Sequence, residues 1–232
     1  MTAQRIGILH PGAMGISIAA SAQKGGQEVY WASQGRSAAT HERAERFALI
    51  DAGTVAHLCS TCNILFSICP PHVAEDVARQ VIGCGFRGLY LDANAIAPQH
   101  ATRIGQALEA ADIGFVDGGI IGGPAWEPGK TWLYLAGPRA GEVASCFVGA
   151  PLQTVVLGEA PGAASALKMC YAAYTKGSSA LLAAILATAE RLGVRQALYE
   201  QWARDDPTMT THVAQRVRGS AAKAWRFVGE ME

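Results

Sequence analysis

The stretch that most limits how this chain can fold lies within its first two dozen residues. Strand-forming residues from Ile6 to Leu9 lead into the turn His10-Pro11-Gly12-Ala13-Met14-Gly15, and Ile16 to Lys24 has the small, apolar composition of a helix packed on a sheet. A strand that enters a helix through such a turn leaves the first helical N–H groups free, and the helix dipole adds partial positive charge. The stretch therefore predicts a binding site for a pyrophosphate.

The turn matches the dinucleotide fingerprint G-x-G-x-x-G, with His10 in place of the first glycine. Gly12 would let the backbone approach the phosphates, and Gly15 would let the helix pack closely on the strand. A glycine turn that binds nothing is the alternative interpretation, but the strand and helix pattern around it favours dinucleotide binding. The residues predicted to contact the cofactor here are His10, Pro11, Gly12, Ala13 and Met14.

The end of the second predicted strand, Glu28 to Ala32, bears on the choice of cofactor. An enzyme that uses NAD usually places Asp or Glu here to bind the ribose 2′-hydroxyl, and this chain has neither. It has Ser33, Arg36 and Ser37, whose guanidinium and hydroxyl groups donate hydrogen bonds to phosphate oxygens. A solvated turn is the alternative. We therefore predict that NADP(H) is preferred over NAD(H).

Apolar runs that suit buried strands alternate with helical segments as far as residue 158, which predicts an α/β fold with a doubly wound parallel sheet of the Rossmann type. Two strand ends are predicted to contact the cofactor, through Cys69, Pro70 and Pro71 and through Asn94. Gly53 to Ala56 is predicted as a short strand. Asp117 to Gly123 is too rich in glycine for a regular element and is predicted as a loop that Asp117 anchors.

An Ala- and Leu-rich segment from Ala163 to Leu192 predicts one long helix that begins a smaller, all-helical domain. We expect a cofactor-binding domain over 1–158 and a helical substrate or dimerisation domain over 159–232, with further helices that include Ser220 to Val228. Lys168 lies in an apolar turn of the long helix, where loss of hydration would lower its pKa toward the range of a general acid or base. A lysine that reaches the helix surface is the alternative. Tyr171 faces the same side.

Composition narrows the class of protein. Lys plus Arg and Asp plus Glu number 19 each, so no basic surplus suggests nucleic acid or a membrane surface as a partner. Charged residues interrupt the most apolar run, which argues against a membrane span. The six cysteines follow no disulfide framework spacing, and a strand starts too early to leave room for a signal peptide. Zinc or redox chemistry is the alternative for Cys59-Ser60-Thr61-Cys62, which has His57, Cys69 and His72 nearby. Cys62 and Cys69 stand at the two ends of a predicted strand, however, about 20 Å apart along the chain, which a tetrahedral site would tolerate poorly. We expect a cytoplasmic protein without a metal.

Five motifs in order resemble the β-hydroxyacid dehydrogenase superfamily, which includes 3-hydroxyisobutyrate and 6-phosphogluconate dehydrogenases, over roughly residues 5 to 195. They are the glycine turn, Cys69-Pro70-Pro71, Asp92 to Pro98, the glycine-rich segment from Asp117 to Gly123, and Gly162 to Lys168. Within the superfamily, the chain is most similar to an uncharacterised branch classed with phosphogluconate dehydrogenases, which carries a C-terminal domain of unknown function. Members of this superfamily carry more helix after the segment that corresponds to the end of this chain, so we expect a shortened helical domain.

The resemblance implies an oxidoreductase in which Lys168 is the general acid or base during hydride transfer. It implies substrate contacts at Asn94, Ile121, Gly122 and Gly123. Tyr171, one helical turn after Lys168, is predicted to contact the same ligand. Apolar residues nearly encircle the long helix, which predicts burial on several sides and a homodimer through the helical domain. Three departures bear on the substrate: Ile121 and Asn94 stand where the family has serine, and Ala172 where it has asparagine. A pocket without that hydroxyl and amide suits a less polar alcohol, carbonyl or imine. The alternatives are an imine reductase-like enzyme, against which the retained Lys168 argues, and a non-catalytic NADP(H)-binding protein.

Overall fold

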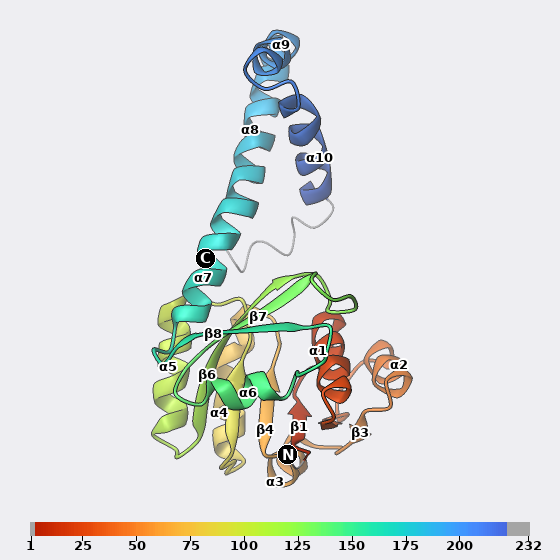
Figure 1. Cartoon of the computed structure of the whole chain (residues 1–232), viewed down its shortest axis with the longest axis vertical. Coiled ribbons are helices and arrows are strands. Elements are labelled where there is room, and N and C mark those ends of the chain that lie inside the picture. The colour runs from red at the N-terminus through yellow and green to blue at the C-terminus, as the bar shows by residue number, and fades with distance from the viewer. Residues whose placement is uncertain (1–2, 222–232) are drawn as a thin grey trace. The chain divides into compact units, whose positions relative to one another are not determined.

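A computed structural model describes residues 3–221 of the chain, and its contacts divide into two compact units, Met1–Met169 and Cys170–Glu232. The described part of the first unit holds an eight-stranded sheet with the strand order β3-β2-β1-β4-β5-β6-β7-β8 (Figure 1). The strands are β1 Arg5–Ile8, β2 Glu28–Trp31, β3 Ile50–Asp51, β4 Ile64–Ser67, β5 Leu89–Asp92, β6 Gly114–Gly122, β7 Thr131–Ala136 and β8 Gln153–Gly158. This order confirms the predicted Rossmann fold.

Helices cover both faces of the sheet, and each face buries its own apolar core. One core joins the strands to α1 (Ala13–Lys24), α2 (Ala38–Arg46) and α6 (Ala140–Ser145). The other joins them to α3 (Val55–Thr61), α4 (Ala74–Gly83) and α5 (Pro98–Glu109), with Tyr90 and Phe86 among its largest buried side chains. Burial on both faces explains why the central strands read as unbroken apolar runs.

Two short predictions were wrong, and one pairing differs from the expected sheet. Gly53 to Ala56 contains no strand, because the Thr54 hydroxyl accepts the backbone N–H of His57 and so starts helix α3. The glycine-rich segment Asp117 to Gly123 lies almost wholly in β6, where it pairs with β7. That pairing is antiparallel in a sheet that is otherwise parallel. Pairing with β7, which runs from Asp117 to Gly122, outweighs the weak strand propensity of glycine.

The predicted long helix is confirmed. Helix α7 (Ala163–Ala172) continues through a π-helical turn at Ala173–Gly177 into α8 (Ser178–Arg191). Within the second unit, α9 (Arg195–Asp205) and α10 (Met209–Ala221) follow, whereas the predicted helix from Ser220 to Val228 lies mostly outside the described residues. Arg216 of α10 donates hydrogen bonds to the carbonyl oxygens of Tyr174 and Thr175, which belong to the π-helical turn. Among the residues described, no helix is both long and apolar enough to cross a membrane.

Candidate cofactor and catalytic site

A cavity of about 380 Å³ opens at the C-terminal ends of β1 and β4, which are neighbours in the sheet. From these two strands the chain leaves toward opposite faces, and ligands of doubly wound sheets bind at such a point. Its volume lies within the range of small-molecule sites. The residues that line it are His10, Pro11, Gly12, Ala13, Met14, Gly15, Arg36, Thr40, Ile68, Cys69 and Pro70. Eight of these belong to the predicted cofactor set: His10, Pro11, Gly12, Ala13, Met14, Arg36, Cys69 and Pro70.

The glycine turn is built to receive a ligand at the start of α1. Gly12 is the N-cap, no side chain caps the helix there, and its first turn holds no acidic residue. A Cβ on Gly12 would meet no atom within 4 Å, so the turn is open on that side. A Cβ on Gly15 would lie 2.2 Å from the carbonyl oxygen of His10, so the helix packs directly on the turn. Free amides, helix dipole and open space together fit a pyrophosphate.

His10 occupies the position of the first fingerprint glycine without adding charge to the cavity. Burial, and secondarily the nearby Arg36 guanidinium, lowers the His10 pKa to about 4, so the imidazole is neutral at physiological pH. Its Nδ1 atom is buried and has no hydrogen-bond partner among the described residues. A buried polar atom without a partner beside an open cradle is consistent with a site that a bound ligand completes.

Two arginines approach the glycine turn from the segment after β2. Arg36 donates from Nη2 to the carbonyl oxygen of Leu9 (3.0 Å), and Arg43 donates from Nε to that of Pro11 (3.3 Å). Arg43 also donates to the Thr40 hydroxyl (3.0 Å), which shares a hydrogen bond with Ser37. This cluster of guanidinium and hydroxyl groups has the chemistry of a phosphate site.

Thr40 and Arg43 were not predicted from the sequence as site residues. Their spacing of three residues at the start of a helix that follows β2 would have been the available signal. Ser33 and Ser37, which were predicted, do not line the cavity, although Ser37 is joined to it through Thr40.

Asn94 links the ends of two strands. Its Oδ1 accepts the backbone N–H of Cys69 (2.6 Å), and its Nδ2 donates to the Ser67 hydroxyl (3.1 Å) and to Asp92 Oδ2 (2.9 Å). The Asn94 side chain is buried, and these bonds occupy both of its polar atoms. It therefore holds the Cys69–Pro70 loop, which lines the cavity, in place. Pro71 starts a 3₁₀ turn beyond that loop and does not line the cavity.

The buried Asp92 carboxyl leads to a prediction about stability. Burial raises the Asp92 pKa to about 7, although hydrogen bonds from Asn94 oppose this shift. The folded state then holds a proton that the unfolded chain releases near pH 4, so the free energy of unfolding falls as the pH rises from about 4 to about 7. We expect Asp92→Asn to remove this slope of a few kcal/mol, as measured by urea unfolding at a series of pH values. An unchanged slope would contradict the assignment to Asp92.

Lys168 lies on α7 against β6, within the first unit. Burial lowers the Lys168 pKa, which agrees in direction with the prediction from its apolar surroundings. A Cβ on Gly119 of β6 would lie 3.2 Å from Lys168 Cβ, so helix and strand are in direct contact at this point. Of the predicted substrate residues, Ile121 is buried in β6, Gly122 ends that strand and Gly123 follows it. Tyr171 is exposed and belongs to the second unit.

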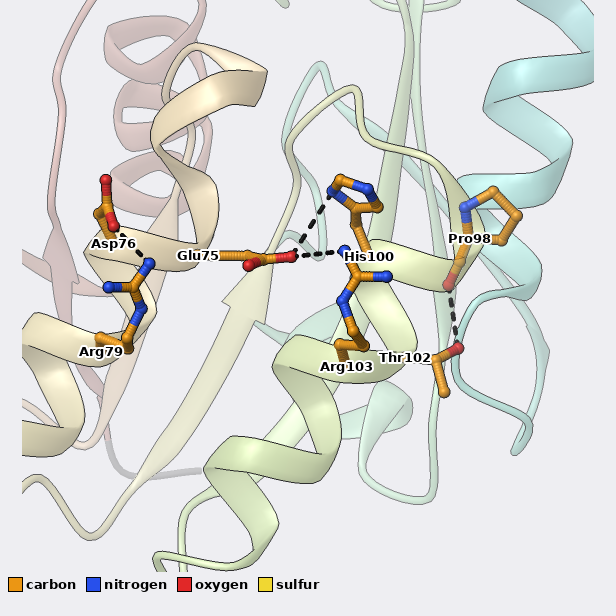
Figure 2. Close-up of polar contacts among 7 residues, drawn as sticks. All are labelled: Glu75, Asp76, Arg79, Pro98, His100, Thr102 and Arg103. Carbon is orange, nitrogen blue, oxygen red and sulfur yellow. Dashed lines mark hydrogen bonds and ion pairs between the residues drawn. The ribbon is translucent and has the colours of Figure 1, made fainter. Parts of the chain in front are cut away.

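A second hollow between α4 and α5 is less suited to a ligand. Its volume is about 140 Å³, and Ala78, Ile82, Ile104 and Ala107 form its apolar lining. Figure 2 shows that its charged residues are already paired: Arg103 with Glu75 at 2.8 Å and Arg79 with Asp76 at 2.6 Å. No group of three or more metal-ligating side chains occurs within residues 3–221.

Comparison with known proteins identifies the family. The NAD-binding domain of 6-phosphogluconate dehydrogenase matches residues 5–143, and a domain of unknown function (DUF1932) matches residues 189–232. The chain belongs to the family of the NAD-binding domain of 6-phosphogluconate dehydrogenase. An uncharacterised 28.5 kDa protein of Methanothermus fervidus is 29% identical over 174 residues, which span 75% of this chain and 66% of that relative. The family match supplies a reason for the glycine turn, the cavity and the strand order together.

Solved structures share the fold over nearly the whole chain. One is a conserved protein of unknown function, described as structurally similar to 3-hydroxyacid dehydrogenases, with a TM-score of 0.76 and 30% identity. The matched region covers 98% of this chain and 86% of that protein. An imine reductase variant from Myxococcus stipitatus in complex with NAD+ has a TM-score of 0.69 (96% and 78% covered). A reductive aminase from Aspergillus terreus in complex with NADPH and ethyl levulinate has 0.68 (96% and 79%). These two are 18% identical to the chain and indicate the fold alone.

Proposed function

We propose that this protein is an NADP-dependent oxidoreductase that acts on a small hydroxy acid or a related alcohol or carbonyl compound. The observation that carries the proposal is that Lys168 has a desolvated amine and a Cβ packed against Gly119 of β6, in the same unit as an open glycine turn. In a sheet of this order, β6 lies three strands from β1, whose end carries the glycine turn, or roughly 14 Å. A dinucleotide bound at the glycine turn, together with a substrate, can span that distance to Lys168.

The glycine turn and the arginine cluster would hold the cofactor. Free amides at the start of α1 bind the pyrophosphate, and Arg36, Thr40 and Arg43 bind a 2′-phosphate. When bound, NADP(H) supplies the hydride donor or acceptor. The Cys69–Pro70 loop, braced by Asn94, limits the cavity on the β4 side.

Lys168 would move the proton that accompanies the reaction. For an alcohol, the neutral Nζ accepts the hydroxyl proton; for a carbonyl, the protonated Nζ donates to the oxygen. Burial lowers the Lys168 pKa, which increases the share of the neutral amine that can accept a proton. Because Ile121 and Ala172 offer neither a hydroxyl nor an amide, we propose a substrate with fewer polar groups than a sugar phosphate. A pocket with few polar groups would also suit an imine, so an imine reductase-like activity is the second candidate.

We also propose that the protein acts as a homodimer through its helical part. Large apolar side chains are exposed along and after α8, namely Leu181, Leu192 and Val194. Exposed apolar groups of this size gain free energy when a second copy covers them.

Calorimetric titration with NADPH and with NADH tests the cofactor assignment. We expect NADPH to bind more tightly, and Arg36→Ala to weaken NADPH by about 10- to 100-fold with little effect on NADH, because charge-assisted hydrogen bonds contribute about 1.5–3 kcal/mol. Arg46→Ala is the matched control, since Arg46 is exposed at the end of α2, the helix that follows Arg36, and does not line the cavity. Failure of both nucleotides to bind would reject the proposed function, and tighter binding of NADH would reject the cofactor preference.

A further inference from the structure

A row of buried polar side chains crosses the sheet behind the candidate site. Ser67 of β4, Asp92 of β5 and Asp117 of β6 are register partners on adjacent strands, and all three are buried. Register partners point to the same face of a sheet. Asn94 ties the first two members to the cofactor loop. The third member, Asp117, is tied to a different element.

Asp117 holds the first turn of α7. Its Oδ2 accepts the backbone N–H of Ser165 (3.0 Å), and its Oδ1 accepts the Ser165 hydroxyl (2.5 Å). The sequence predicted that Asp117 anchors its own glycine segment, whereas its partner is a residue 48 positions later in the chain. A carboxylate at a helix N-terminus is favoured by the helix dipole, and both bonds offset the cost of burying the charge.

Two glycines set how deeply α7 packs. A Cβ on Gly119, two residues after Asp117, would lie 2.6 Å from the carbonyl oxygen of Ala164. Gly162, which precedes α7 and has φ +94°, packs on α5, where a Cβ would lie 3.1 Å from Thr102 Oγ1 and 3.3 Å from the Pro98 carbonyl oxygen. Figure 2 shows Pro98 and Thr102 joined by a hydrogen bond at the start of α5. These contacts therefore fix both the distance of α7 from β6 and the rotation of α7 about its own axis.

We propose that Asp117 and Ser165 are positioning residues for Lys168. Ser165 precedes Lys168 by one helical turn, so fixing Ser165 to β6 keeps the Lys168 Cβ packed against Gly119 of that strand and its amine desolvated. The role of Lys168 as a general acid or base rests on the proposed function, but its positioning by Asp117 and Ser165 does not. The pair acts through the helix and touches no reacting atom. Through Asp117, this pair also connects the helix that carries Lys168 to the row of buried polar side chains that supports the Cys69–Pro70 loop.

The test is a titration of the Lys168 amine in the whole protein without cofactor or substrate. Trace labelling with isotopic acetic anhydride over roughly pH 6 to 11, read by mass spectrometry, gives the midpoint for each lysine. We expect a wild-type Lys168 midpoint below the ordinary lysine value of about 10.4 and a rise toward that value in Ser165→Ala. Ser165→Thr retains the hydroxyl and should restore the lower midpoint.

Asp117→Asn separates positioning from electrostatics. Removal of a negative charge would by itself lower a lysine pKa, so a rise of the midpoint indicates that α7 has lost its hold and that the amine is rehydrated. Ser179→Ala is the control, because Ser179 is another buried helical serine whose hydroxyl donates to the Thr175 carbonyl oxygen and accepts from Arg216, all within the second unit. We expect it to leave the Lys168 midpoint unchanged.

The result that would overturn the proposal is a lower melting temperature in Ser165→Ala and Asp117→Asn with an unmoved Lys168 midpoint, since that describes a purely structural pair. An ordinary midpoint in the wild type would overturn it as well. If the midpoint shifts as expected while no carbonyl or imine substrate is turned over, the positioning role is supported and the proposed function fails. The two failures are therefore distinguishable.

Discussion

Replacement of Lys168 with methionine is expected to reduce turnover by about 10³-fold, the usual contribution of a positioned general acid or base. Methionine has a similar length and no titratable group, so it removes the proton carrier and preserves the packing of α7 on β6. NADPH affinity, measured by calorimetry, should stay within about twofold of the wild type, because Lys168 does not line the cofactor cavity. Turnover would be followed at the nicotinamide absorbance with a panel of small carbonyl and imine substrates.

The pH profile adds a second criterion for Lys168. Carbonyl reduction requires the protonated amine, so its rate should fall as the pH rises through the lowered pKa of Lys168, and alcohol oxidation should show the opposite trend. Lys24→Met is the matched control, because Lys24 is exposed in the last turn of α1. Wild-type turnover by the Lys168 variant would contradict the mechanism. Intact NADPH binding without turnover by any form of the protein would favour the non-catalytic alternative.

Much of the first unit could be predicted because its local and tertiary preferences agree. The buried strands are apolar on both faces, and turns rich in glycine and proline separate them from helices. The segment from Asp117 to Gly122 was missed because its glycines disfavour an isolated strand. In the fold those glycines are what allow close contact: a Cβ on Gly118 would lie 2.8 Å from Leu91, and one on Gly119 would meet α7. Tertiary packing, which the local sequence does not display, decides such cases.

The candidate site was predictable where backbone conformation dominates and less so where distant side chains meet. The glycine turn and the Cys69–Pro70 loop were recognised from strand ends and turn residues, and both line the cavity. Asn94 was predicted as a ligand contact, yet its amide atoms are occupied by Cys69, Ser67 and Asp92. The pairing of Asp117 with Ser165 spans 48 residues, and no local pattern could indicate it. The cofactor preference and the role of Lys168 remain predictions.

The glycine turn offers a pair of substitutions that separate ligand binding from folding. Gly12 has φ −70° and free space around its Cβ position, so Gly12→Ala should fold and melt like the wild type. A new methyl group would nevertheless occupy the space that a pyrophosphate needs against the start of α1. Because several charge-assisted hydrogen bonds of about 1.5–3 kcal/mol would lengthen together, we expect NADPH to bind at least about 100-fold more weakly.

Gly15→Ala should have the opposite signature. Its Cβ would lie 2.2 Å from the His10 carbonyl oxygen, a backbone atom that cannot move without displacing α1 from β1. We expect the free energy of unfolding to fall by about 3 kcal/mol in urea titrations, with the gain in helix propensity offsetting part of the overpacking. If Gly12→Ala bound NADPH as tightly as the wild type, the open side of the turn would not be where the phosphates lie. Loss of binding at Gly12 with stability retained, set against loss of stability at Gly15, would mean that the turn serves the ligand through one glycine and the fold through the other.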